Sequence, residues 1–191
     1  DGTTFTTPFM RGMDGDKNGL LMRDMFLDTA LMAKLIMGLD YVDETRVATQ
    51  GGSQGGALSV ACACLVPTIK KCVACHPYLS DYKRVYEMDL NKGAYEGLKY
   101  YIRKFDPRHE REDEIFAKLG YIDIQNLAKR MKAEFIMYTG LMDTICPPST
   151  QFAAFNAITS EKEVVLYHDF GHEHLPQSGD ITLQYMLEML N

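Results

Sequence analysis

The feature that most constrains the fold is the run Gly51-Gly52-Ser53-Gln54-Gly55, which fits the pattern Gly-x-Ser-x-Gly. Residues 46–50 before it can form a short strand, and the small apolar residues 57–65 after it predict a buried helix. Where a strand turns sharply into a helix, the central serine sits at a strained apex, and glycines two positions away avoid side-chain collisions. A plain glycine-rich turn has the same composition, but the flanking strand and helix favour a nucleophilic serine at position 53.

The rest of the chain alternates between expected strands and expected helices. Strands are expected at 71–75, 133–141 and 163–168, and helices at 24–39, 151–158 and 181–190. This alternation predicts an α/β fold with a mostly parallel sheet, helices on both faces and right-handed crossovers. The 191 residues, 46% of them hydrophobic, are enough for a single domain, 1–191, with its own core.

Residues 79–131 hold most of the long charged stretches and predict a helical insertion between two strands. Within it, Asp106 is expected to cap a helix with Pro107 in its first turn, ending at Leu119 before Gly120. The first twenty residues, rich in Gly, Thr and Asp, are expected to form a loop.

A serine hydroxyl is a poor nucleophile unless a base takes its proton, and a third group must orient that base. In an α/β-hydrolase these residues follow the chain order Ser, acid, His, on loops at the carboxyl ends of strands. Asp143 follows one expected strand, and His172 follows the last one, directly after Gly171. The sequence therefore predicts Ser53, Asp143 and His172 as a catalytic triad. The backbone N–H of Gln54, at the start of the helix, is the expected first oxyanion donor.

Other acids and histidines compete for these roles. Asp81 and Asp89 also follow a strand but precede the insertion, and Asp169 shares a loop with His172, where it is expected to structure the turn. His168 and His174 are the alternative bases. Together with Asp169 and His172 they also suggest a metal site, although Gly171 argues against the helix that His-x3-His needs. We interpret His76 and His109 as structural or surface histidines, with His76 near the site because it ends a strand.

Composition excludes several classes of partner. The formal net charge of −6 and the lack of a dense Lys/Arg cluster argue against nucleic acid, and no apolar run approaches the roughly 20 residues of a bilayer span. The five cysteines, mostly in apolar surroundings, are typical of buried thiols in a reducing compartment. Cys72 and Cys75 have Cys-x-x-Cys spacing, but in a strand they face opposite sides, which argues against a redox or metal pair. The predicted chemistry needs no metal and no organic cofactor.

Several segments together resemble one family. They are Gly51–Gly56, Pro77-Tyr78-Leu79-Ser80-Asp81, Phe105-Asp106-Pro107-Arg108-His109-Glu110, Asp143 followed by Pro147-Pro148, and His172-Glu173. Over essentially the whole chain they resemble the acetyl xylan esterase/cephalosporin C deacetylase family (carbohydrate esterase family 7). The resemblance implies an α/β-hydrolase fold and a serine deacetylase acting on acetylated xylo-oligosaccharides and cephalosporin C. It places the triad on Ser53, Asp143 and His172, and implies a cytoplasmic homo-oligomer, a hexamer whose sites face an internal cavity.

The chain departs from the family upstream of the nucleophile. The family's Arg-Gly-Gln-Gly motif, and a tyrosine whose backbone N–H is the second oxyanion donor, have no counterpart in these residues. Only one expected strand precedes Ser53, whereas this architecture normally has several there. We therefore expect these residues to be the C-terminal part of a longer protein that supplies the second donor; a short variant is the alternative. Without that donor the rate would fall roughly 10²–10³-fold.

Two other functions fit the same residues. One is a serine peptidase of the prolyl-oligopeptidase type, which shares the elbow and the triad order but normally adds a propeller domain. The other is a binding module, or a catalytically weak fragment, that has kept the fold.

Overall fold

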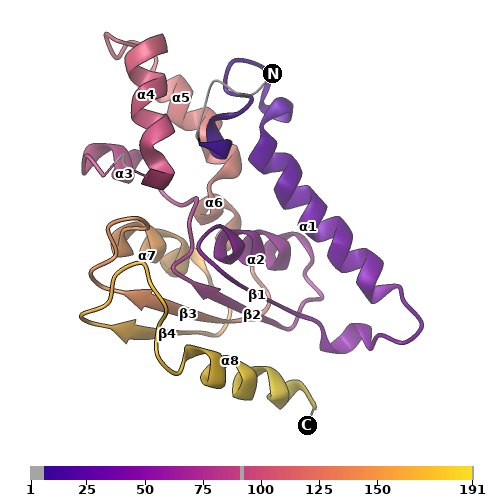
Figure 1. Ribbon diagram of the computed structural model, residues 1–191. Helices are drawn as coiled ribbons and strands as arrows, with labels where there is room; N and C mark the ends of the chain where they lie inside the picture. The colour runs from indigo at the N-terminus through magenta and orange to yellow at the C-terminus, as the bar shows by residue number, and fades with distance from the viewer. Residues whose placement is uncertain (1–6, 91–92, 191) are drawn as a thin grey trace.

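The computed structural model describes residues 7–90 and 93–190 and shows a parallel sheet covered by helices (Figure 1). The strands are β1 (Ala48–Gly52), β2 (Lys71–Cys75), β3 (Glu134–Gly140) and β4 (Lys162–Tyr167). They lie in the order β1-β2-β3-β4, and every neighbouring pair is parallel. The predicted α/β class is confirmed, and the carboxyl ends of all four strands meet at one edge of the sheet.

Helices connect the strands and cover both faces of the sheet (Figure 1). The α-helices are α1 (Leu21–Met37), α2 (Gln54–Leu65), α3 (Tyr82–Glu87), α4 (Glu96–Phe105), α5 (Glu112–Leu119), α6 (Ile124–Ala128), α7 (Pro148–Ala157) and α8 (Ser178–Leu187). Short 3-10 turns are η2 (Pro8–Met10), η3 (Lys17–Gly19), η4 (Glu44–Arg46), η5 (Gly93–Tyr95), η6 (Gly120–Ile122) and η7 (Glu188–Leu190). None of the helices in the described part of the chain combines the length and apolar character needed to cross a membrane.

Alternation along the strands separates two cores. Cys72 and Ala74 of β2 belong to the larger core, together with buried residues of α2, whereas Val73 belongs to a smaller core against which Ile181 and Tyr185 of α8 pack. Cys75 packs against that smaller core too. The two cysteines of the Cys-x-x-Cys pair therefore face opposite sides of the sheet, as a strand requires.

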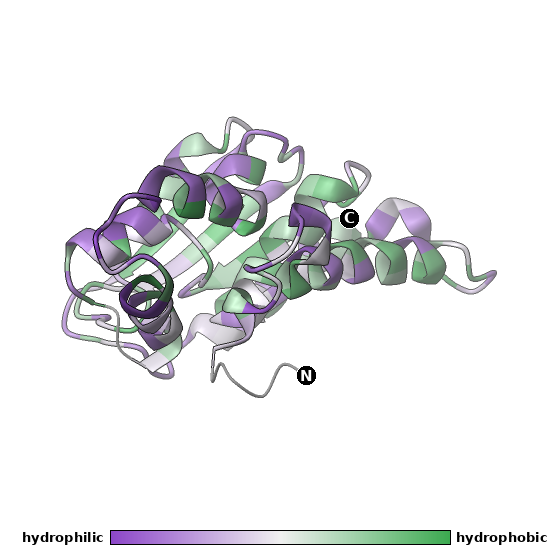
Figure 2. Cartoon of the chain, turned by 90° about the horizontal axis from the view of Figure 1, so that it is seen from above, coloured by the Kyte–Doolittle hydropathy of each residue, from purple (hydrophilic) through white to green (hydrophobic). Residues whose placement is uncertain are grey.

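The helix α2 is buried because it is small and apolar on every side. Ala57, Ala61 and Ala63 are fully buried, since α2 lies between the sheet and α1. By contrast, several apolar residues of α1 lie at the surface: Leu31 is 56% and Leu35 58% exposed. The buried positions of α1 are instead Met22, Phe26, Ala30 and Ala33. Seen from above, α1 carries hydrophobic residues out to the far end of the molecule (Figure 2).

Between β2 and β3 the described residues form only helices and turns, from α3 to α6. The expectation that Asp106 starts a helix was wrong, because α5 begins only at Glu112. The buried Asp106 carboxylate accepts hydrogen bonds from the backbone N–H groups of Glu110 and Arg111, at 2.8 and 2.9 Å. It thus closes a turn between α4 and α5, and Pro107 lies in that turn.

The N-terminal segment is more ordered than the expected loop. Residues 1–6 lie outside the described part, but Phe9 and Met10 of η2 are buried. The Phe9 ring stacks on Tyr82 with centroids 5.1 Å apart and meets Tyr95 edge-on. These aromatic contacts tie η2 to the helical insertion.

Candidate active site

Ser53 lies at the turn where β1 ends and α2 begins. Its backbone has φ 54° and ψ −119°, a conformation that residues other than glycine rarely adopt. The turn is held by the strand beside it, because the Ser53 N–H donates to the Cys75 carbonyl at 2.8 Å and the Tyr78 N–H donates to the Ser53 carbonyl at 3.1 Å. The strain at the nucleophile is thus supported by backbone hydrogen bonds to the segment that follows β2.

The two glycines of the Gly-x-Ser-x-Gly pattern differ in what they do. A Cβ on Gly51 would overlap the backbone carbonyl of Gly55, so the turn cannot accept a side chain there. A Cβ on Gly55 would meet nothing within 4 Å among the described residues outside its own helix. The expected collision therefore explains Gly51, but for Gly55 it was wrong, because Gly55 contributes its backbone and not an excluded side chain.

Replacing Gly51 by alanine is expected to lower the free energy of unfolding by about 3 kcal/mol or more, because either β1 or α2 must shift. Gly55→Ala is the matched control and is expected to change stability by no more than about 1 kcal/mol, since alanine favours the helix. Urea unfolding of both variants checks this. Equal stabilities would contradict the steric explanation of Gly51.

Asp143 lies on the loop after β3 and is 3% exposed. Its Oδ1 accepts hydrogen bonds from the backbone N–H groups of Ile145 and Cys146, both at 2.8 Å. These bonds fix the carboxylate plane, and Oδ2 faces the loop after β4. The side-chain amide of Gln151 donates to the Cys146 carbonyl at 2.5 Å and lies 3.5 Å from Oδ2, which supports the same loop from α7.

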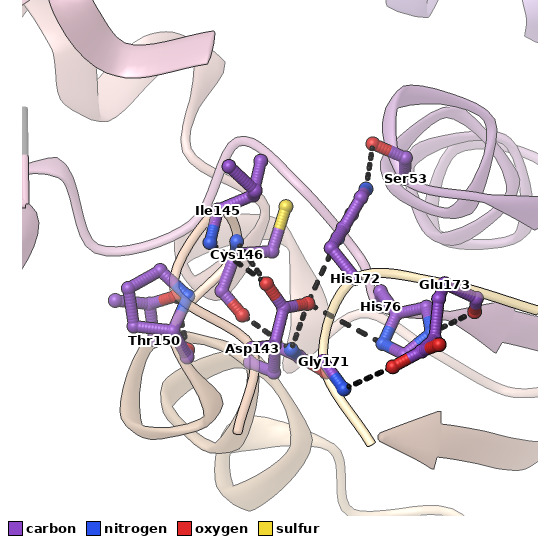
Figure 3. Close-up of polar contacts among 11 residues, drawn as sticks. Ser53, His76, Asp143, Ile145, Cys146, Thr150, Gly171, His172 and Glu173 are labelled. Atoms are coloured by element: carbon purple, nitrogen blue, oxygen red, sulfur yellow. Dashed lines mark hydrogen bonds and ion pairs between the residues drawn. The ribbon is translucent and has the colours of Figure 1, made fainter. Parts of the chain in front are cut away.

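His172 joins the other two predicted residues (Figure 3). Its Nδ1 lies 2.8 Å from Oδ2 of Asp143, and its Nε2 lies 3.0 Å from Oγ of Ser53. The Glu173 carboxylate accepts a hydrogen bond from the Gly171 N–H at 3.0 Å and so closes the turn that presents the ring. The three predicted side chains, far apart in sequence, form one hydrogen-bonded line with the geometry of a serine, its base and an orienting acid.

Gln54 is the first residue of α2. Its backbone N–H is one of the four that helix geometry leaves without a partner inside the helix, at the positive end of the helix dipole. This places a donor directly after the nucleophile, as an oxyanion hole requires.

The rival acids have structural roles. The Asp81 side chain caps α3 by accepting from the Arg84 N–H, and Asp89 pairs with Lys99. Asp169 is exposed on the turn after β4.

The rival histidines lie outside the hydrogen-bonded line. His168 and His174 are exposed, and His109 pairs with Glu112 on the surface. The competition between the three neighbouring histidines is therefore resolved by position, since only the His172 ring reaches both Ser53 and Asp143 among the described contacts.

His76 contributes more to the site than the sequence suggested. It follows β2, is 4% exposed, and its Nδ1 lies 3.3 Å from the same Oδ2 that His172 contacts. Its Nε2 lies 3.1 Å from the Glu173 carbonyl, and its ring centroid is 5.1 Å from that of His172. Burial holds the pKa of His76 below its usual value. In the sequence, the one indication that His76 lies near the site was its place at the end of an expected strand.

His76, Asp143 and His172 also form the one group in the described residues with metal-ligand spacing, since their donor atoms lie within 4.8 Å of one another. Both Asp143 oxygens and both nitrogens of His172 are engaged in hydrogen bonds. We therefore assign a hydrogen-bonding network, and not a metal site, to this group.

The five cysteines are free thiols. Burial raises the pKa of Cys64 and Cys72 to about 12 and that of Cys75 to about 11. At neutral pH these thiols are protonated, and a protonated thiol is neither a good nucleophile nor a good metal ligand.

Three comparisons with known proteins show what the chain is similar to. The family model described as acetyl xylan esterase (AXE1) matches residues 2–189. The curated acetyl esterase Axe7A of Xylanibacter ruminicola is 34% identical over 155 residues, which cover 78% of this chain and 34% of that protein. The crystal structure of acetyl xylan esterase 1 from Thermoanaerobacterium sp. matches with 52% identity and a TM-score of 0.97, covering 100% of this chain and 60% of that one. The acetyl xylan esterase from Paenibacillus sp. R4 matches with 36% identity and a TM-score of 0.87, covering 91% and 54%.

A parallel sheet with a serine at the turn after β1, an aspartate on the loop after β3 and a histidine on the loop after β4 defines a protein of the α/β-hydrolase class. Within that class, the chain belongs to the acetyl xylan esterase (AXE1) family, because the family model spans nearly all of it. It covers about a third of the length of Axe7A and 54–60% of the two solved structures.

Proposed function

We propose that the protein is a serine esterase that removes acetyl groups from acetylated xylan fragments. The observation that carries the proposal is the hydrogen-bonded line from Ser53 Oγ through His172 to Asp143, with contacts of 3.0 and 2.8 Å. The names of the relatives support acetyl esters as the substrate class.

In the proposed reaction Ser53 Oγ attacks the acetyl carbonyl while its proton moves to Nε2 of His172. Asp143 holds the proton on Nδ1, so that Nε2 is the basic nitrogen, and stabilises the imidazolium that forms. The carbonyl oxygen becomes an oxyanion, for which the Gln54 N–H is the donor that this chain supplies.

Collapse of the tetrahedral intermediate breaks the bond to the sugar oxygen, which takes the proton from His172 and leaves as an alcohol. A water molecule then attacks the acetyl-Ser53 ester, again giving its proton to Nε2. Collapse of this second intermediate returns the proton from Nε2 to Ser53 Oγ, and acetic acid leaves and ionises in solvent. Every proton in the cycle moves between Ser53, His172, water and the leaving oxygen.

Three finer expectations stay predictions and rest on the resemblance. They are deacetylation of cephalosporin C, assembly into hexamers and a cytoplasmic location. The second oxyanion donor is likewise proposed to come from outside these residues. In the described residues β1 pairs only with β2, so its other edge is open to further strands.

Labelling tests the nucleophile directly. A serine-directed organophosphonate is expected to modify Ser53 stoichiometrically, identified by peptide mass spectrometry, and 4-nitrophenyl acetate is expected to give a burst from the acetyl-enzyme. Acetylated xylo-oligosaccharides should be hydrolysed in preference to peptidyl amides. An unlabelled Ser53 would refute the esterase and support a binding module, and faster cleavage of the amides would favour the peptidase.

A further inference from the structure

His76 is a second imidazole on the Asp143 carboxylate. It comes from the segment after β2, whereas His172 comes from the loop after β4, yet both rings direct Nδ1 at the same oxygen, Oδ2 (Figure 3). The distances are 3.3 Å from His76 and 2.8 Å from His172. Asp143 is 3% and His76 4% exposed, so water does not screen this arrangement well.

The partners of His76 define which of its nitrogens carries a proton. The Glu173 carbonyl oxygen, 3.1 Å from Nε2, and Asp143 Oδ2, 3.3 Å from Nδ1, can both only accept. Only the contact of Nε2 has hydrogen-bond geometry, so we assign the hydrogen of the neutral ring to Nε2. A neutral imidazole has a single N–H, and Nδ1 is then a lone pair facing a carboxylate oxygen. In agreement, Nδ1 of His76 is buried without a hydrogen-bond partner.

A protonated His76 would satisfy both contacts at once, because each nitrogen would then donate. Several groups that face the ring influence whether His76 is protonated. Asp143 and Glu173 favour the charged ring, whereas burial and the nearby His172 oppose it. Burial is the largest of these effects, so His76 is neutral near neutral pH.

We propose that His76 is a positioning residue of the esterase site, which works only while this ring is neutral. Neutral His76 holds the Glu173 carbonyl next to His172 and leaves Oδ2 to His172. When a proton from solvent binds Nδ1, His76 donates to Oδ2 in competition with His172. It also places a second positive charge on a ring whose centroid lies 5.1 Å from that of His172, where the reaction must form an imidazolium. The inference rests on the proposed function.

The acid limb of the pH profile of kcat/KM measures how many histidines must be neutral for activity. If a single histidine had to be neutral, log kcat/KM would fall with a slope of one on the acid side of the profile. With two neutral histidines required, the limb steepens toward a slope of two, and the two steps belong to the coupled pair. A slope of two is reached only at the acid end of the limb, below both steps, and burial, which lowers the pKa of His76, moves its step to lower pH. One pH unit below that second step, the rate is about tenfold below a one-proton curve.

His76→Gln is the informative variant. The His76 backbone has φ 45°, a region that Gln177 of this chain also adopts, and the glutamine amide reaches the place of Nε2, so it can still donate to the Glu173 carbonyl but never carries the charge. His109→Gln is the matched control, because His109 has φ 58° and lies on the surface against Glu112. We expect a slope approaching two for the wild type and His109→Gln, and a slope of one for His76→Gln. At the acid end His76→Gln should retain at least about tenfold more of its pH 8 activity.

A one-proton limb in the wild type, or an unchanged limb in His76→Gln, overturns the inference. If His76→Gln does not fold, the slope of the wild type alone decides. Organophosphonate labelling of Ser53 at pH 8 separates this test from that of the esterase: labelling with a one-proton limb overturns only the role of His76. No labelling at pH 8 overturns both.

Discussion

Ser53→Ala is expected to lower kcat for acetyl-ester hydrolysis by a factor on the order of 10⁵–10⁶. The Oγ that His172 activates is removed, and no other hydroxyl takes its place in the described contacts of the His172 ring. The residual rate would come from substrate binding and from the N–H of Gln54, which the substitution leaves in place. Folding should be unaffected, because the turn is held by the backbone bonds of residue 53 to Cys75 and Tyr78.

Ser160→Ala is the matched control for this measurement. The Ser160 hydroxyl donates to the Ala133 carbonyl at 2.7 Å, at the amino ends of the strands and far from the elbow. Its removal should leave kcat within about twofold of the wild type, because Ser160 lies at the opposite ends of the strands from the triad and its loss costs the fold only one hydrogen bond, about 1 kcal/mol. Initial rates with 4-nitrophenyl acetate, with circular dichroism to check folding, give the comparison. Retention of activity by a folded Ser53→Ala protein would refute the role of Ser53.

The hydrogen-bonded line from Ser53 to Asp143 was predictable from the sequence because the carboxyl ends of parallel strands lie at the same edge of the sheet. Asp143 and His172 each follow a strand, so the topology brings their loops beside the elbow whatever the sequence between them. The elbow itself is a local pattern, readable from five residues. Strand positions were off by about two residues only where a turn competed, as where η4 delays β1 to Ala48.

Other features depend on contacts that local pattern does not encode. His76 reaches Asp143 from the segment after β2 and Gln151 reaches it from α7, and neither stands in a recognisable motif. The helix at 24–39 was predicted from the helical spacing of its apolar residues. Spacing does not say which of those residues pack against another element, and Leu31 and Leu35 are exposed. Asp106 has the sequence context of a helix cap, but it closes a turn instead, because its carboxylate accepts hydrogen bonds from the N–H groups of Glu110 and Arg111.

Asp143→Asn is expected to lower kcat by about 10⁴ without unfolding the protein. Two backbone N–H groups, from Ile145 and Cys146, point at Oδ1, so the asparagine must turn its carbonyl oxygen toward them. Its NH2 group then takes the place of Oδ2 and faces Nδ1 of His172. Because that group only donates, the ring must carry its hydrogen on Nε2 instead. An Nε2–H facing Ser53 Oγ cannot accept the serine proton, and the nucleophile loses its base.

Asp106→Asn isolates this effect from the general cost of removing a buried carboxylate. Asp106 is also buried and also accepts from two backbone N–H groups, but it closes a turn of the helical insertion. Both variants should lose similar stability in urea unfolding, while only Asp143→Asn loses activity. NMR of the histidine ring nitrogens should show the His172 proton moving from Nδ1 to Nε2. A folded Asp143→Asn protein within tenfold of the wild-type rate would mean that Asp143 does not set the tautomer, and that the base at Ser53 is oriented by the loop alone.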